Sequence, residues 1–135
     1  MKHYCYLLFT LLSLSSVFAQ FSKTHYIPPI TSTNSSGASI EEQYLYISTP
    51  SVTTVHFKII ELGGATILGT VSRSTPFEYF VGSGPNTQLN MNSNSINTIS
   101  SNKGYIIEAE EDVIYVTARV NAGNGNQAGE LVSKG

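Results

Sequence analysis

The stretch Val52–Val71 reads VTTVHFKIIELGGATILGTV, and it carries the clearest fold signal in the chain. From Val55 to Ile59 every second residue is apolar, which is the period that a half-buried β-strand produces. Gly63 and Gly64 separate this run from a second apolar run, and paired glycines at that point predict a tight hairpin. The stretch therefore predicts two antiparallel strands, over residues 52–62 and 65–71.

Short alternating runs recur on both sides of this hairpin. The further predicted strands lie at residues 43–48, 76–81, 105–110 and 113–120, with one or two weak strands in 87–100 and the start of another at 128–134. We expect the strands at 105–110 and 113–120 to form a second hairpin around Glu111 and Asp112. Because no stretch has a convincing helical period, the sequence predicts an all-β fold, an antiparallel β-sandwich of about seven short strands.

Strand alternation also assigns residues to the two faces of each strand. The predicted core residues are Phe57, Ile59, Ile67, Phe80, Ile107, Val116 and Ala118. Lys58, Glu108 and Arg119 are predicted to lie outside, because a one-residue register shift would bury them, at a cost of several kcal/mol for each unpaired charge.

The composition limits the classes of function. The chain has 135 residues, of which 41% are hydrophobic, so it can form one domain with a core. Charged residues make up 12%, about half of the roughly 25% that is usual in globular proteins. Seven basic residues against nine acidic ones leave no excess of positive charge for a polyanion. We therefore expect no binding to nucleic acid.

The first residues are typical of an export signal. A basic start, an apolar run over Leu7–Leu14 and a small residue at Ala19 predict a signal peptide over residues 1–19, cleaved before Gln20. The run is shorter than the roughly 20 apolar residues that span a bilayer. We therefore expect a secreted or cell-surface protein with no membrane span after processing, from which Cys5, the single cysteine, has been removed.

After the signal peptide, two regions differ in composition. Residues 20–42 are polar and contain two adjacent prolines and a Ser/Thr/Asn run, which favours an extended leader lying along the domain. The strand signals fall in residues 43–135, which we interpret as the β-sandwich module.

Residues that could carry out catalysis are few. His25, His56 and Asp112 are the only histidines and the only aspartate after the signal peptide, and we interpret both histidines as surface residues. Nucleophilic catalysis needs a base held beside a nucleophile, and no such arrangement is predicted. We therefore expect a protein that is not an enzyme and uses no cofactor.

Acidic residues gather between the last two predicted strands. Glu108, Glu110, Glu111 and Asp112 lie close together in the sequence, but they are not opposed across a cleft as glycosidase carboxylates are. We interpret them as a solvated hairpin tip. Calcium bound near Glu110, Glu111 and Asp112 remains open as the alternative, because hard oxygen ligands suit this ion.

Two tyrosines are candidate ligand contacts. Tyr44 and Tyr46 are two residues apart and therefore share one face of a predicted strand. An exposed pair of this kind can stack on sugar rings. The alternative interpretation places both tyrosines at the edge of the sandwich core.

Five segments carry a family resemblance in their order and spacing. They are Gln20–Pro29 (QFSKTHYIPP), Glu42–Pro50 (EQYLYISTP), Gly69–Ser72 (GTVS), Asn102–Ala109 (NKGYIIEA) and Ala128–Gly135 (AGELVSKG). In these segments the chain resembles the first region of large secreted Bacteroidetes proteins, which is similar to the N-terminal domain of IgGFc-binding proteins. Those proteins end in a gliding-motility-associated sorting domain that the type IX secretion system reads.

The resemblance implies a non-catalytic, β-rich extracellular module of a cell-surface adhesin or a gliding-motility-associated protein. It also implies an extracellular protein or glycan as the partner, and a longer parent protein with further domains, of which residues 43–135 are a truncated part. A carbohydrate-binding module that uses Tyr44 and Tyr46 is the first alternative, and a fragment of a secreted hydrolase is the second.

Overall fold

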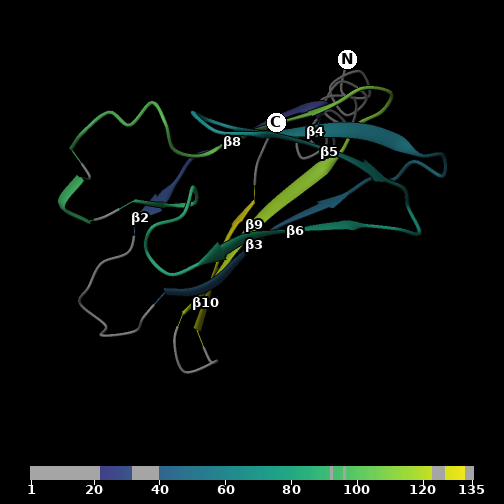
Figure 1. The fold of residues 1–135 in the computed structure, drawn as a ribbon. Helices are drawn as coiled ribbons and strands as arrows, with labels where there is room; N and C mark the ends of the chain where they lie inside the picture. Colours follow the sequence, from purple (N-terminus) through teal and green to yellow (C-terminus); the bar gives the residue numbers. More distant parts are fainter. Residues whose placement is uncertain (1–21, 32–39, 92, 96, 123–126, 133–135) are drawn as a thin grey trace, which may run out of the picture.

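A computed structural model describes residues 22–31, 40–91, 93–95, 97–122 and 127–132 of the chain. Two four-stranded antiparallel sheets make up most of this part and pack face to face as two layers (Figure 1). The predicted all-β antiparallel sandwich is thereby confirmed.

The first sheet has the strand order β1-β8-β4-β5. Its strands are β1 (Thr24–Ile27), β8 (Tyr105–Ala109), β4 (Val55–Glu61) and β5 (Thr66–Val71). The second sheet has the order β10-β9-β3-β6. Its strands are β10 (Gln127–Val132), β9 (Tyr115–Ala122), β3 (Ile40–Ser48) and β6 (Phe77–Ser83).

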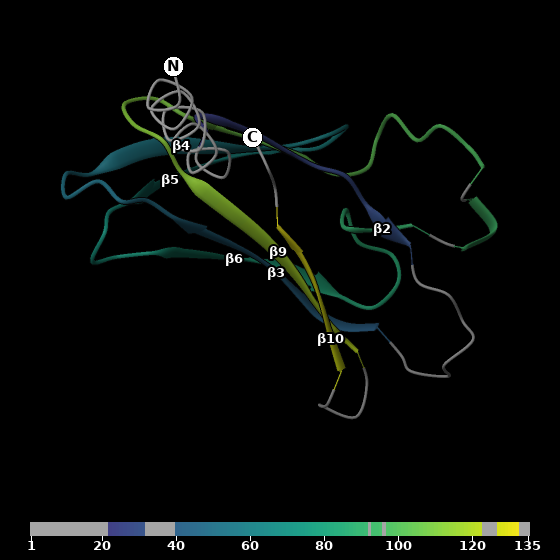
Figure 2. The same cartoon turned by 180° about the vertical axis from the view of Figure 1, so that it is seen from behind.

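A small parallel pair stands apart from the sandwich. It joins β2 (Ile30–Thr31) to β7 (Asn90–Met91), and the 3-10 turn η3 (Ser93–Ser95) follows. In the view from behind, β2 lies beyond the end of the two layers (Figure 2). Residues 87–100, where one or two weak strands were predicted, thus contain one two-residue strand in their described part, and Ile99 is fully exposed.

The predicted hairpin at Gly63 and Gly64 is confirmed. β4 and β5 pair antiparallel from Val55 opposite Val71 onward. Gly63 has a φ of 79°, and the Gly64 amide donates a 3.0 Å hydrogen bond to the carbonyl of Glu61. A left-handed third residue and this bond between the first and fourth residues are features of a type II turn, in which glycine is favoured.

The predicted second hairpin is wrong. Its two strands, β8 and β9, lie in different sheets: β8 pairs with β1 and β4, whereas β9 pairs with β3 and β10. The segment between them crosses from one layer to the other, and it is held by backbone bonds between Ser22 and Ile114 in both directions. Alternation shows that one face of each strand is buried, but it does not show which strand lies beside it.

The segment predicted as a leader contributes to both sheets. Its residues Thr24–Ile27 are β1, which pairs with β8 from Thr24 opposite Glu108 to Ile27 opposite Tyr105. β3 begins at Ile40, three residues before the predicted start of the first strand.

The core lies between the two sheets and follows the predicted faces with one error. Of the predicted core residues, Phe57, Ile59, Ile107, Val116 and Ala118 are buried, and Ile67 is partly buried against them. Phe80, however, is 52% exposed, so its assignment to the core is wrong. Ile27, Leu45, Ile47, Val55, Val71, Leu89, Tyr105 and Ile114 complete the buried hydrophobic set among the described residues.

The charged residues that were predicted to lie outside do so. Lys58 and Glu108 are partly exposed and form an ion pair of 2.7 Å on the outer face of the first sheet, and Arg119 is exposed. Opposite charges on directly paired residues contribute modestly to sheet stability, because solvent screens them.

Candidate functional site

The two candidate tyrosines lie on the outer face of the second sheet. Along β3, Gln43, Leu45 and Ile47 are buried, whereas Tyr44 and Tyr46 alternate with them and are partly exposed. The centroids of the two tyrosine rings are 5.9 Å apart, within the range of interacting aromatic pairs. The structure therefore places the pair on the outer surface rather than in the core.

Phe80 extends this pair into a three-ring surface. It pairs with Tyr44 across β6 and β3, and the centroids of these two rings are 5.4 Å apart. We call Tyr44, Tyr46 and Phe80 the aromatic face. The sequence contained a signal for Phe80: Glu78 lies two residues earlier and therefore shares its side of the strand, while Phe77 and Tyr79 pack against the core.

Charged side chains surround the aromatic face. The Tyr44 hydroxyl donates a 2.8 Å hydrogen bond to Glu42 Oε2. In the strand register Glu78 lies opposite Tyr46, and Arg119 of β9 lies opposite Tyr44. Glu78 and Arg119 could not be predicted as neighbours of the tyrosines, because their proximity depends on which strands pair. Glu42 is two residues before Tyr44 on the same strand, just ahead of the strand start predicted at residue 43.

The surroundings of both tyrosines raise the pKa of their hydroxyl groups. The hydrogen bond to Glu42 is the main cause that raises the pKa of Tyr44 to about 12. Partial burial, followed by the nearby Glu78 carboxylate, raises the pKa of Tyr46. At physiological pH the aromatic face therefore presents neutral phenols beside negative carboxylates and one guanidinium.

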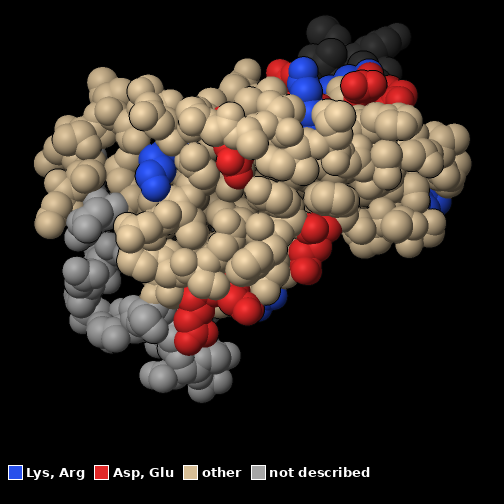
Figure 3. All heavy atoms as spheres, viewed as in Figure 1, with Lys and Arg blue, Asp and Glu red and all other residues tan. Residues whose placement is uncertain are grey.

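This arrangement suits the binding of an amphipathic ligand. Aromatic rings offer flat apolar area with little rotamer freedom to lose, and hydroxyl and carboxylate groups at the edge can bond to polar groups of a ligand. Charged side chains are few across the face of the molecule in Figure 3 and lie in small separate groups.

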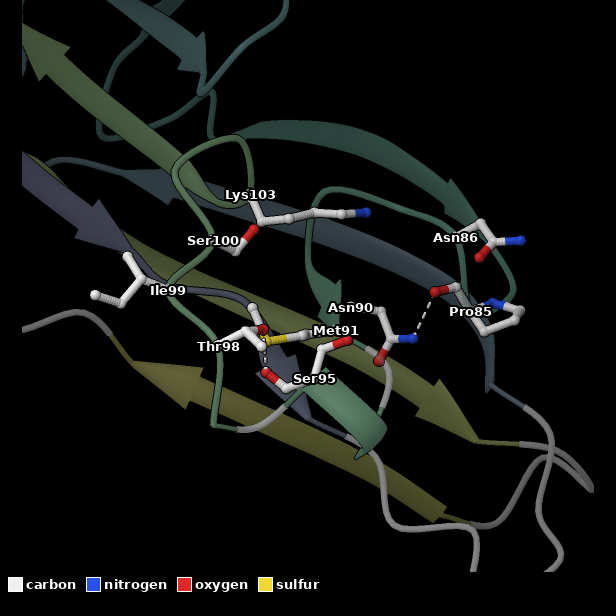
Figure 4. Close-up of a pocket in the computed structure, with 9 residues that line it drawn as sticks. All are labelled: Pro85, Asn86, Asn90, Met91, Ser95, Thr98, Ile99, Ser100 and Lys103. Atoms are coloured by element: carbon white, nitrogen blue, oxygen red, sulfur yellow. Dashed lines mark hydrogen bonds between the residues drawn. The ribbon is translucent and has the colours of Figure 1, made fainter.

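A pocket of about 280 Å³ with a mixed polar and apolar lining lies elsewhere, within the stretch that connects β6 to β8 (Figure 4). Its polar groups largely bond to nearby protein atoms: Asn90 donates to the Pro85 carbonyl at 2.6 Å, and Lys103 donates to the Thr87 carbonyl at 2.6 Å. Thr98 donates to the Ser95 carbonyl at 2.7 Å. Because these side chains already donate hydrogen bonds to the protein, they have fewer groups available to a ligand. This pocket is therefore a weaker candidate binding site than the aromatic face.

The two histidines do not form one site. His25 is fully buried, so its interpretation as a surface residue is wrong. It alternates inward on β1, and its Nε2 lies 2.9 Å from the Ile114 carbonyl and 3.1 Å from the Ser22 carbonyl. Because carbonyls accept hydrogen bonds, Nε2 carries the proton. His56 lies on the opposite, outer face of the same sheet and is exposed, as predicted.

The acidic cluster is divided among separate partners. Glu111 accepts bonds from His56, at 2.7 Å from the backbone amide and 2.6 Å from Nδ1, and the first of these is the main cause that lowers the pKa of the Glu111 carboxyl. Asp112 accepts from the Val113 amide at 2.8 Å, and the backbone carbonyl of Glu110 accepts from Lys23. Within the described ranges, no group of three or more His, Cys, Asp and Glu residues could hold a metal ion. The structure therefore does not bring the candidate calcium ligands together.

Two further predictions concern the cleavage site of the signal peptide and membrane-spanning segments. The proposed cleavage site, Ala19 and Gln20, lies outside the described residues. In the part of the chain that the structure describes, no helix is long and apolar enough to cross a membrane.

Comparisons with known proteins give no relative. No family model, no curated protein and no solved structure matches the chain.

Proposed function

We propose that this chain is a non-catalytic, extracellular β-sandwich module that attaches a surface protein to its ligand through the aromatic face. The observation that carries this proposal is the cluster of Tyr44, Tyr46 and Phe80 on the outer side of the second sheet. Phe80 is 52% exposed there. It occupies an outward strand position, at which the fold does not require an apolar residue. Exposed apolar surface bordered by polar groups is typical of binding sites.

A binding role fits the chemistry of the described side chains better than catalysis. The buried ring of His25 bonds to main-chain carbonyls, and His56 bonds to Glu111 on the other face of the sheet. A hydrolase would need its base and nucleophile to converge in a cleft. The groups that do converge are aromatic rings, carboxylates and a guanidinium on an open surface.

The extracellular assignment is based on the sequence. The export signal predicted over residues 1–19 and the resemblance to secreted Bacteroidetes proteins support a role in surface adhesion or gliding. We propose that the module is secreted or held at the cell surface, that further domains follow it in a longer parent protein, and that the type IX secretion system exports that protein.

The aromatic face also favours a specific alternative, a carbohydrate-binding module. Sugar rings present apolar C–H faces that stack on aromatic rings, and their hydroxyls bond to carboxylates and guanidinium groups. Glu42, Glu78 and Arg119 stand beside the rings in positions that could make such bonds.

One experiment tests the binding site and separates the two ligand classes. The processed protein is applied to a glycan array and to immobilised extracellular proteins, together with Tyr44→Ala and Phe80→Ala. We expect each variant to bind at least about tenfold more weakly, which corresponds to about 1.4 kcal/mol. Val52→Ala is the matched control, because Val52 is 76% exposed and lies in the segment between β3 and β4. Unchanged binding by both aromatic variants would contradict the proposed site.

A further inference from the structure

The four edge strands of the sandwich differ in their protection. An edge strand presents unpaired N–H and C=O groups, and proteins commonly block such edges with charges, prolines, bulges or very short strands. β1 has four residues and is followed by Pro28 and Pro29. β6 carries Glu78 and pairs with β3 through a register irregularity, and the sequence of β10 contains Glu130.

β5 has none of these protections. Its six residues, Thr66–Val71, contain no charge and no proline, and its pairing with β4 runs without a register shift. Leu68 in its centre is 77% exposed. An uncharged, regular edge with an exposed leucine is the type of edge that pairs with another strand.

The backbone pattern shows which groups of β5 are available. The Glu61 amide donates to the Ala65 carbonyl at 2.9 Å, so Glu61 and Ala65 occupy a hydrogen-bonded position of the ladder. Bonded and non-bonded pairs alternate in an antiparallel ladder. Ile67 and Gly69 therefore direct their N–H and C=O groups to β4, whereas Thr66, Leu68 and Thr70 direct theirs away from the sheet.

We propose that β5 pairs antiparallel with β5 of a second copy of this chain, across a two-fold axis at Leu68. In this register Leu68 faces Leu68 of the second copy, and each Thr66 faces a Thr70. All three residues have outward-directed backbone groups, so the register uses every free donor and acceptor at these positions. The two first sheets become one continuous eight-stranded sheet.

The side chains around β5 also fit a second copy. Because β5 is uncharged, two copies meet without like-charge repulsion. Lys58, which lies opposite Leu68 on β4, is paired with Glu108. Two inward residues along this side, Ile67 of β5 and Phe77 of β6, are only partly buried, although Val71 at the end of β5 is buried. A neighbouring copy would cover part of this exposed surface.

The symmetry has a consequence for binding that depends on the proposed function. A two-fold axis perpendicular to the joined sheet places the second sheets of both copies on the same side of it. The two aromatic faces would then point in the same direction, and a repetitive surface could engage both at once. The dimer itself does not depend on the identity of the ligand.

Sedimentation velocity over a wide concentration range tests the dimer. The processed protein is expected to associate to a dimer, and Leu68→Lys should weaken this association more than about a hundredfold, because it sets two like charges opposite each other. Val52→Lys, at a position that is equally exposed, should dimerise as the unaltered protein does. A protein that stays monomeric throughout, or equal effects of the two lysines, would overturn the proposal.

Cross-linking tests the register. Directly bonded antiparallel pairs have Cα atoms about 5.5 Å apart, within the range that a disulfide spans. Leu68→Cys in the processed chain, oxidised with glutathione disulfide, should form a covalent dimer, whereas Val52→Cys should not. Absence of the Leu68→Cys dimer would show that the two-fold axis does not pass through Leu68. Circular dichroism confirms that each variant is folded.

Discussion

Phe80 of β6 lies directly opposite Tyr44 of β3, and the centroids of their rings are 5.4 Å apart. Since Tyr44 also contacts Tyr46, the rings form a continuous surface across two strands. Aromatic pairs of this kind contribute roughly 0.5–1.5 kcal/mol each beyond their burial, so the rings hold one another in place. The surface is therefore organised before a ligand arrives, and this limits the entropy lost on binding.

The two faces of the sandwich predict opposite effects for two phenylalanines. Phe57 is 2% exposed and meets Phe77 of the other sheet at 5.0 Å between ring centroids, so Phe57→Ala should lower the free energy of unfolding by about 3–5 kcal/mol. Phe80→Ala should lower it by less than about 1.5 kcal/mol, the loss of one surface ring contact. Urea unfolding measures both values, and equal losses would contradict the assignment of Phe80 to the surface.

Glu42 should control the titration of Tyr44. Its hydrogen bond raises the pKa of Tyr44 from 10.0 to about 12, and Glu42→Gln should return the pKa toward 10.0. Because the folded-state pKa is the higher one, this stabilisation is fully present below pH 10 and is lost as the pH rises through about 12. NMR titration of ring-labelled tyrosine follows Tyr44 directly. Glu111→Gln is the control, since that carboxylate bonds to His56, and a Tyr44 pKa that Glu42→Gln leaves unchanged would show that the hydrogen bond does not form in solution.

Gly69 should tolerate no side chain beside Phe57. The two residues face each other across β5 and β4, and a Cβ atom on Gly69 would overlap the Phe57 ring. Gly69→Ala should therefore lower the free energy of unfolding by about 1–3 kcal/mol. In the Phe57→Leu background the same change should cost less, because the smaller side chain leaves room. Thermal unfolding of the four proteins gives this coupling, and strictly additive losses would argue against the contact.

The exported protein should begin at Gln20. The predicted signal peptide ends at Ala19, which supplies the small residue that signal peptidase requires before the cleaved bond. Mass spectrometry of the secreted protein determines its first residue. A secreted form that retains Leu12 or Leu14 would contradict the signal-peptide interpretation.

Much of the fold could be predicted from the sequence because alternation and turn residues are local signals. The strand positions, the Gly63 hairpin and the buried faces of β4 and β9 follow from neighbouring residues. The separation of β8 and β9 into different sheets could not be predicted this way. It depends on the partners β1 and β3, which lie far away in the sequence.

The candidate site was predicted only in part for the same reason. Tyr44 and Tyr46 share a strand, so their spacing was enough to pair them. Phe80 joins them through the pairing of β6 with β3. In residues 77–81 (FEYFV) both sides of the strand are apolar except at Glu78. That single charge was the only local signal of the outward face. His25 was misassigned because the sequence around it is polar and was interpreted as a leader. In the structure it belongs to the edge strand β1, and its inward side is covered by the core.

The most direct test of the proposed function is to locate the bound ligand on the protein. The array experiment supplies the ligand, and NMR chemical shifts of the processed protein are then measured as it is added. We expect the largest changes at Tyr44, Tyr46 and Phe80, with Glu42 and Arg119 following. Changes centred instead on Met91, Ile99 and Lys103, around the pocket of Figure 4, would contradict the assignment of the aromatic face as the binding site.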